Sequence, residues 1–251
     1  QAFKDDTSNV ADDWAGETLD QATSPYAIPN RRQAFTLNDT SIPIVWWRSV
    51  YSSTNSFAQE SFMDEMAHAA GKDPLDFRLE MLKNEPRWTA LLHFLVEKSD
   101  YRNQRKAGKA VGIGIAHPFG STAAYAVTVS KKDAGVSIEK IVGVIDCGQY
   151  VNPDTVKAQT EGNVVMALSA AVKPAITFAE GQAQESNFHQ FSILRLNETP
   201  PMEIHIIENN EAPGGAGEPG LPPFTAALCN AIFLATGKRV RKLPFDLENL
   251  I

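Results

Sequence analysis

The stretch YAVTVSKKDAGVSIEKIVGVID, residues 125–146, sets the fold class of this 251-residue chain. Residues 125–129 and 136–146 are rich in β-branched side chains that recur at every second position, and Lys131–Gly135 between them has the composition of a turn. A period of two on both sides of a turn is typical of a β-hairpin. The same pattern occurs upstream at Val111, Ile113 and Ile115, so the whole region predicts an antiparallel meander.

A helix is expected before the meander. Ser56–Gln59 forms a capping box, in which the serine hydroxyl and the glutamine side chain satisfy each other's backbone donors, and this predicts a helix start. Gly71 predicts the end of that helix, since glycine readily adopts the left-handed conformation that closes a helix. The apolar positions expected to be buried are Phe57, Phe62, Met66, Ala69 and Ala70.

Strands and helices continue to the end of the chain in separate runs. Such runs indicate an α+β fold, with mixed or antiparallel sheets flanked by helices. Residues 1–40 are polar and predict an irregular lead-in with a short strand near residues 34–37, and residues 41–251 predict one region that opens with an extended segment over residues 42–51. The other expected helices cover residues 73–82, 88–97 and 152–172 and start again at Pro222, and the other expected strands cover residues 188–196 and 202–207.

Composition and charge exclude several classes of protein. A net charge of −7 leaves no basic face to displace counterions from DNA or RNA, so no nucleic-acid partner is expected. No apolar run approaches the roughly 20 residues that span a bilayer. Cys147 and Cys229 alone cannot build a zinc or iron–sulfur site, and they are expected to be buried free thiols. The chain does not begin with Met, which indicates a processed or excised piece of unknown compartment.

The loop GGAGEPG, residues 214–220, contains a Gly-x-Gly-x-x-Gly pattern between a strand pattern and a helix pattern. It could bind a dinucleotide phosphate, it could be a hinge, or it could present Glu218 to a ligand from a backbone that Pro219 stiffens. The phosphate hypothesis is the weakest, because Pro219, Pro222 and Pro223 remove backbone donors where phosphate would need them. From the loop alone, a hinge is the simplest interpretation.

Other candidate residues also have structural interpretations. Arg48 follows two tryptophans and could be a stacked surface arginine. Trp46, Trp47 and Phe57 are interpreted as core residues in preference to a substrate pocket, which would also be largely aromatic, and Gln159 could be an exposed helix residue. His117 is isolated, so a hydrogen-bonding role is favoured over metal binding. The basic cluster Lys238–Lys242 is expected to be a turn that follows a helix.

A set of segments occurs in one order over most of residues 25–246. The set resembles the molybdenum-binding large subunit of the xanthine dehydrogenase/aldehyde oxidase family, in particular the branch that contains the β-subunit of isoquinoline 1-oxidoreductase. The resemblance implies that residues 41–251 are the C-terminal, molybdopterin-binding region of a larger subunit. The segments are WRSV (47–50), NSFAQESFMDEMA (55–67), AGKDPLDFR (70–78), VIDCG (144–148), VNPD (151–154), QTEG (159–162), NF (187–188), GGAGEPG (214–220) and ATGK (235–238).

The resemblance implies a chemistry and a set of site residues. The reaction would be the oxidation of an N-heterocycle or an aldehyde, with water as the oxygen source, at a molybdenum centre bearing hydroxyl and sulfido ligands. Glu218 would be the general base, and Arg48 would orient the substrate oxygen. Molybdenum would be held through a molybdopterin, expected in its cytosine dinucleotide form, rather than by protein ligands. The residues expected to contact this cofactor are Trp47, Arg48, Ser49, Gln159 and Gly217.

The sequence also departs from the family pattern. The Gly-Gln-Gly and Gly-Gly-Phe-Gly loops of this branch and its iron–sulfur unit do not occur in the chain. Asn163 stands where a second glycine is common, and Lys173-Pro174 where an acidic residue often lies. The resemblance therefore implies two partners, an iron–sulfur electron-transfer subunit and the missing N-terminal part of the same subunit, and it implies that the isolated chain is inactive. Two alternatives stay open: a non-catalytic relative with an assembly or binding role, and a nucleotide-binding oxidoreductase.

Overall fold

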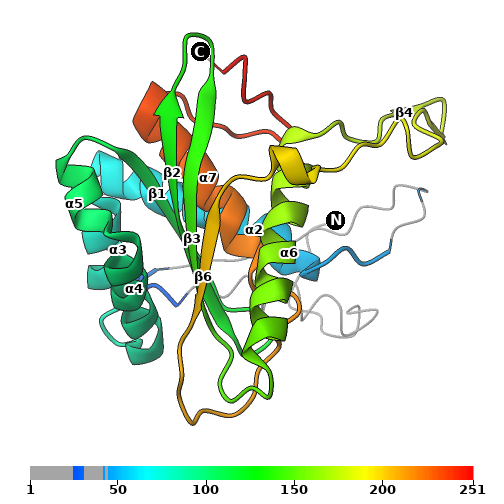
Figure 1. Cartoon of the computed structure of the whole chain (residues 1–251). Coiled ribbons are helices and arrows are strands. Elements are labelled where there is room, and N and C mark those ends of the chain that lie inside the picture. The colour runs from blue at the N-terminus through cyan, green and yellow to red at the C-terminus, as the bar shows by residue number, and fades with distance from the viewer. Residues whose placement is uncertain (1–24, 31–41, 43–44, 251) are drawn as a thin grey trace.

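The computed structural model of the protein describes residues 25–30, 42 and 45–250 (Figure 1). The strand expected near residues 34–37 lies outside this part of the chain. The longer elements are the helices α2 (Val50–Ala69), α3 (Pro74–Met81), α4 (Pro86–Ser99), α5 (Tyr101–Lys106), α6 (Pro153–Val172) and α7 (Leu221–Thr236), and the strands β1 (Ala110–Ala116), β2 (Thr122–Lys131), β3 (Val136–Asp146) and β6 (Met202–Ile206).

One mixed sheet forms the centre of the molecule, with the strand order β1-β2-β3-β6. β1, β2 and β3 pair as antiparallel neighbours, which confirms the meander expected from the sequence. β6 then pairs with β3 in the parallel sense, over Ile141–Ile145 of β3. The parallel strand makes the sheet mixed, and the α+β class is confirmed.

Helices cover both faces of this sheet (Figure 1). Successive side chains of a strand point to opposite faces, so β2 contributes to two cores. Tyr125, Val127 and Val129 pack with α6 and α7 on one face. Ala124 and Ala126 pack on the other face, with a cluster that includes leucines of α3 and α4. Burial on both faces explains why the meander is apolar at nearly every position.

The helix α7 lies directly against β1, because two glycines of β1 face it. A Cβ atom at Gly112 would stand 2.2 Å from the carbonyl oxygen of Ala227, and one at Gly114 would stand 2.3 Å from that of Pro223. Both distances are far below a van der Waals contact, so only glycine permits this approach. The glycines that alternate with the apolar residues of β1 thus fix the height of α7 above the sheet.

The start and the buried face of α2 differ from the prediction. The helix begins at Val50, so Ser56 lies inside it and the capping box does not start it. Residues 43–44 of the extended segment predicted over 42–51 lie outside the described residues, and the prediction was wrong at residues 48–51, where a turn leads into the helix. Phe62 is 58% exposed, and Ala69 and Ala70 are exposed too. Met66 packs against the core as predicted, but the stripe was wrong at Phe62, Ala69 and Ala70. Charged side chains with partners on other elements occupy the buried face instead: Glu60 and Asp64, beside Met63 and Ala67.

The remaining long helices follow their predicted signals. Asp73 caps α3, since its carboxylate accepts a hydrogen bond from the Leu75 amide at 2.9 Å. Asn152 caps α6 in the same way. Gly71 and Gly237 have φ angles of +64° and +76°, and each follows the end of a helix. Among the residues that the structure describes, no helix combines the length and the apolarity needed to cross a membrane.

An arm formed by residues 174–199 projects from the body of the molecule (Figure 1). The strand predicted over residues 188–196 is wrong, because the arm contains only the short strands β4 (Phe178–Ala179) and β5 (Gln182–Ala183) and a 3₁₀ turn at Leu196–Glu198. Leu194 packs into the core beside α6, but most of the other apolar side chains of the arm are exposed, so their alternation does not report a buried strand face. Phe188 is 91% exposed and Leu196 is 94% exposed.

Candidate functional site

Arg48 joins three segments that are distant in the sequence. Its Nε donates a hydrogen bond to the carbonyl oxygen of Gly217 at 2.9 Å, and its Nη2 donates to Oε1 of Gln159 at 2.7 Å. Nη2 also makes a short contact with the same Gly217 oxygen. These partners are 169 and 111 residues away in the chain. The structure thus brings together Arg48, Gln159 and Gly217, which the sequence placed at a cofactor only by resemblance.

Ser49 connects the same corner to Glu218. Its backbone amide donates to Oε2 of Glu218 at 2.5 Å, and its hydroxyl donates to the carbonyl oxygen of Glu218 at 2.8 Å. The serine is fully buried, whereas Glu218 is half-buried. Glu218 therefore lies on a loop at the edge of the protein, with one carboxylate oxygen fixed.

The helices α2 and α7 run side by side from a common start at this site. Asn230 of α7 donates to the carbonyl oxygen of Glu60 at 3.3 Å, and the rings of His68 and Phe233 are 5.0 Å apart near the other end. Both helices therefore present their N-terminal ends to the corner that contains Glu218. A helix N-terminus carries a partial positive charge, which favours a carboxylate there.

The loop that leads to Glu218 is fixed by backbone hydrogen bonds. The amide of Gly214 donates to the carbonyl oxygen of Cys147 at 2.9 Å, and the amide of Gly215 donates to that of Phe119 at 2.8 Å. A Cβ at Gly214 would stand 2.3 Å from the hydroxyl oxygen of Ser121. Close approach to neighbouring backbone, rather than hinge freedom, explains the glycines at the start of this loop.

Asp146, at the end of β3, is a hub of hydrogen bonds that was not predicted from the sequence. Its carboxylate accepts hydrogen bonds from Arg87 at 2.5 and 2.8 Å, from Asn209 at 2.9 Å and from the Gly148 amide at 3.0 Å. Burial alone would raise the pKa of Asp146, but the Arg87, Asn209 and Gly148 hydrogen bonds outweigh it and lower the pKa. The hub joins α4 and the segment after β6 to the strand. A carboxylate that ends a buried strand was the available signal.

The N-terminus of α7 offers few donors to a phosphate. Pro222 and Pro223 have no amide hydrogen, and the Leu221 amide donates to the carbonyl oxygen of Glu218 at 3.0 Å. The preceding strand, β6, pairs with β3, and residues 208–213 separate it from the glycines. The geometry therefore argues against the dinucleotide-loop hypothesis, which needs a tight strand-to-helix turn with free amides.

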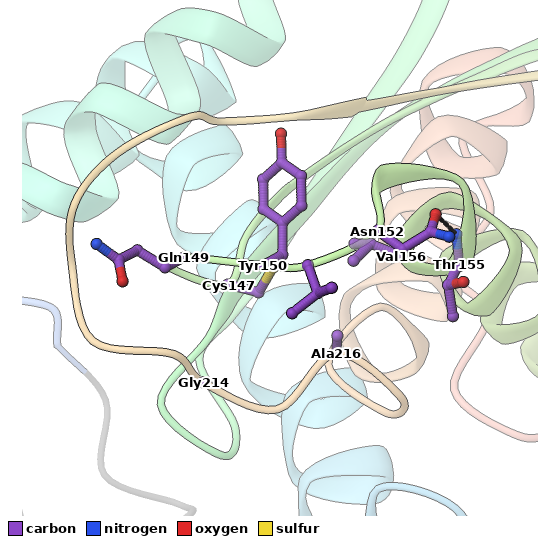
Figure 2. A pocket seen from close by; sticks show the side chains of 9 residues that line it. Cys147, Gln149, Tyr150, Asn152, Thr155, Val156, Gly214 and Ala216 are labelled. Atoms are coloured by element: carbon purple, nitrogen blue, oxygen red, sulfur yellow. Dashed lines mark hydrogen bonds between the residues drawn. The ribbon is translucent and has the colours of Figure 1, made fainter.

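A pocket of about 300 Å³ opens between the start of α6 and the Gly214–Ala216 part of the loop (Figure 2). In Figure 2 the Tyr150 ring points away from Ala216, and its hydroxyl donates to Glu208 at 3.3 Å. Cys147 lines the pocket, and burial raises the pKa of its thiol. The pocket includes neither Arg48 nor Glu218, so it is separate from the corner described above.

The remaining candidate residues from the sequence are either exposed or hydrogen-bonded within the fold. Trp46 is 64% exposed and Trp47 is 43% exposed, so the expectation that both belong to the core was wrong. His117 lies 2.6 Å from the Thr122 hydroxyl, which confirms a hydrogen-bonding role. Both cysteines are buried and free, as expected. In the basic cluster, Arg239 pairs with Asp64 at 2.6 Å and Arg241 with Glu65 at 2.5 Å.

Known proteins match most of this chain. Residues 48–200 match the family described as molybdopterin cofactor-binding domain. The chain is 32% identical to the β-subunit of isoquinoline 1-oxidoreductase of Brevundimonas diminuta over 224 residues, which cover 87% of this chain and 29% of the relative. It is 33% identical to a subunit of nicotinate dehydrogenase of Pseudomonas putida over 249 residues, which cover 90% of this chain and 21% of the relative. The chain thus spans less than a third of the length of either relative.

Solved structures share the fold. Quinoline 2-oxidoreductase from Pseudomonas putida 86 matches with a TM-score of 0.68 at 11% identity, over 81% of this chain and 52% of that one. An aldehyde oxidoreductase from Desulfovibrio desulfuricans matches with a TM-score of 0.65 at 16% identity, over 81% of this chain and 40% of that one. At such low identity the likeness concerns the fold alone, and it agrees with the mixed sheet flanked by helices.

Proposed function

The chain belongs to the molybdopterin cofactor-binding domain family of the molybdenum-binding subunits of xanthine dehydrogenase-type enzymes, and from this premise we propose that it forms part of a molybdenum hydroxylase. The proposed reaction is the oxidation of an N-heterocycle or an aldehyde, with water as the oxygen source and Glu218 as the general base. The observation that carries the proposal is the convergence of Arg48, Gln159 and Glu218 at one corner, from three distant segments.

The residues of this corner fit a molybdopterin. The hydrogen bonds of the described residues use Nε and Nη2 of Arg48 and Oε1 of Gln159, which leaves Nη1 of Arg48 and the amide group of Gln159 as donors. Nothing lies within 4 Å of the position that a Cβ at Gly217 would take. Pterin rings and phosphates carry acceptors for such donors, and the open side of Gly217 admits a bulky group. Arg48, Gln159 and the backbone of Gly217 would hold the cofactor, and the exposed Trp47 would contact it.

The protein residues prepare the proton transfer. When bound, the molybdenum cofactor supplies the oxygen-transfer and electron-accepting chemistry. Glu218 keeps Oε2 on the Ser49 amide, so Oε1 is the atom that accepts a proton. Arg48 is held by Gly217 and Gln159, and its free Nη1 would orient the oxygen of the substrate. Positioning by rigid partners is what makes a general base efficient.

The proposal includes partners and a cofactor form. Since the chain spans 29% and 21% of two relatives that are named as subunits, the rest of the large subunit would complete the cofactor cleft. An iron–sulfur subunit would carry the electrons away. The cofactor would be the cytosine dinucleotide form of molybdopterin, and the isolated chain would be inactive.

Molybdenum content tests the split cleft. Elemental analysis is made on this chain alone and on the chain co-expressed with the rest of the large subunit and the iron–sulfur subunit. The expected result is about one molybdenum per complex and none on the chain alone. Tight stoichiometric molybdenum on the isolated chain would contradict the split cleft. No molybdenum in either sample would favour the assembly or binding role without catalysis.

Glu218→Gln tests the general base in the complex that contains molybdenum. The amide keeps the size of the side chain but cannot accept the proton, so kcat with an aldehyde or an N-heterocycle should fall by about 10²–10⁴-fold. Molybdenum content should not change. Glu97→Gln is the matched control, because the Glu97 side chain is 69% exposed on α4 and its carboxylate pairs with Lys98 at 2.9 Å. Full activity of Glu218→Gln would overturn the assignment of the base.

A further inference from the structure

Ser49 and Val50 have a backbone conformation that their side chains disfavour. Their φ angles are +71° and +47°, in the left-handed region. Such a conformation costs of order 1–3 kcal/mol for a residue with a Cβ, and it is least favourable for a β-branched residue such as valine. Glycine would adopt it without this cost. A serine at this position therefore needs a compensating role for its side chain.

The hydroxyl of Ser49 makes no capping hydrogen bond to its own helix. It is the N-cap residue of α2, a position where a serine side chain ordinarily accepts a hydrogen bond from the first turn, but no such bond is present. The hydroxyl instead donates to the carbonyl oxygen of Glu218 at 2.8 Å, across 169 residues of sequence. The residue that contacts the proposed general base thus has an unfavourable backbone conformation and also lacks the hydrogen bond of a helix cap. Both features destabilise the start of α2 locally.

The two hydrogen bonds from Ser49 act on different parts of Glu218. The hydroxyl holds the main chain of the loop, and the amide, at 2.5 Å from Oε2, holds the carboxylate. The loop is also limited from its other side, where a Cβ at Gly220 would stand 2.7 Å from the Tyr125 hydroxyl. The hydrogen bonds of the described residues engage only Oε2, so Oε1 is left for the reaction.

We propose that Ser49 is a positioning residue, which fixes the Glu218 main chain through its hydroxyl and directs Oε1 of the carboxylate toward the reacting group. The inference rests on the proposed function of Glu218 as the general base. It gives the hydroxyl of Ser49 a role other than a contact with the cofactor. The left-handed turn at residues 49–50 is what places the amide and the hydroxyl on the same partner.

The test compares Ser49→Ala, Ser49→Gly and Ser53→Ala in the complex that contains molybdenum. Ser53 is the matched control, since its hydroxyl donates to the Val50 carbonyl of the same helix, at 2.7 Å. Both Ser49 variants should lower kcat by about threefold to tenfold, the usual effect of one hydrogen bond, with KM and molybdenum content unchanged. If only the backbone conformation mattered, Ser49→Gly would keep full kcat and the proposal would be wrong.

Two further measurements separate this inference from the proposed function. In a Glu218→Gln background, Ser49→Ala should cause no additional loss, because a positioning residue acts through the base. An additional loss of the same size would overturn the proposal. Hydrogen exchange of residues 214–220, measured on the chain itself, should be about tenfold faster in Ser49→Ala and unchanged in Ser53→Ala. If Glu218→Gln is inactive but Ser49→Ala behaves as wild type in both assays, only the positioning role fails.

Discussion

Two charged clusters on the same helix differ in what surrounds them. In the middle of α2, Glu60 pairs with Arg78 at 2.9 Å, and both side chains are completely enclosed. Tyr26 donates to Glu60 at 2.7 Å, and burial followed by the charge of Glu60 raises the pKa of Tyr26. At the start of α2, Arg48 and Glu218 keep donor and acceptor atoms at an open edge. We call these the enclosed cluster and the edge cluster.

The difference shows how similar groups serve different purposes. In the enclosed cluster, Arg78 also donates to the carbonyl oxygens of Glu60 and Pro74, and Glu60 also accepts from the Ile115 amide at 3.2 Å. The hydrogen-bonding capacity is used within the protein, so the cluster joins α2, α3 and β1. The edge cluster keeps hydrogen-bonding groups that no described residue uses, since Gln159 is exposed and nothing lies within 4 Å of a Cβ position at Gly217. Enclosure makes the first a connection within the fold, and the open edge makes the second the site proposed for a ligand.

The largest expected effect comes from making one substitution in both clusters. Arg78→Met should lower the free energy of unfolding by about 3–5 kcal/mol, because it leaves the Glu60 carboxylate buried without its partner. Arg48→Met should lower it by less than about 1 kcal/mol, since its partners stay accessible to water. Urea denaturation of both variants measures the difference. Equal losses would remove the distinction between the two clusters.

A smaller effect, dependent on pH, is expected at Asp146, whose side chain is 3% exposed. Asp146→Asn should cost about 1.5–3 kcal/mol at pH 7, as hydrogen bonds to a charged group are lost. The folded state has the lower pKa, so this stability is present above the ordinary pKa of about 3.9 and is lost as the pH falls through the lowered value. The difference between wild type and variant should therefore shrink below about pH 4.

Urea denaturation between pH 7 and pH 3 follows this effect. Asp133→Asn is the control, because Asp133 is exposed in the turn between β2 and β3. A constant difference between wild type and Asp146→Asn over the whole range would mean that the carboxylate charge of Asp146 does not stabilise the fold. In that case Asp146 would contribute little to stability, as we expect for the edge cluster and not for the enclosed cluster.

Two glycines near α7 extend the comparison to backbone packing. Gly112→Ala should cost about 1–3 kcal/mol, because the new methyl group would stand 2.2 Å from the backbone of α7. Gly217→Ala should change stability by less than about 0.5 kcal/mol, since nothing lies within 4 Å of its Cβ position. Thermal unfolding of the two variants measures this. A loss at Gly217 as large as that at Gly112 would contradict an open edge at the site.

The smallest effect is expected on the arm. Phe188 is 91% exposed, so Phe188→Ser removes almost no buried contact. The free energy of unfolding of the chain should change by less than about 0.5 kcal/mol. Urea denaturation of the variant beside the wild type measures it. A loss above about 1 kcal/mol would mean that the Phe188 side chain packs against another part of the chain.

The sequence predicted some elements well because their signals are local. Three kinds of signal were placed correctly, since each depends on neighbouring residues. They are the helix caps at Asp73-Pro74 and Asn152-Pro153, the turn at residues 131–135 and the glycines after the helices. The start of α2 was missed because Ser49 is tied to Glu218, which is far away in sequence. The false strand at residues 188–196 arose because an apolar pattern cannot report whether a partner strand exists.

The candidate site also separates what local sequence signals predict from what depends on long-range contacts. Resemblance alone proposed Arg48, Gln159 and Glu218, and their roles stay proposals. The distances that join them depend on how α2, α6 and α7 pack against the sheet. The ion pair between Asp146 and Arg87 was not predicted, because nothing in the neighbourhood of either residue signals the other.

By itself the sequence determined the alternating strands, the helix caps, the net charge of −7 and the two free thiols, since each follows from composition or from residues close in the chain. Only the tertiary structure decided that α2 begins at Val50, that Glu60 and Arg78 face inward, and that Ser49 meets Glu218. Contacts across 169 residues depend on the joint packing of helices and sheet, and pairwise distances of this kind have no local signature.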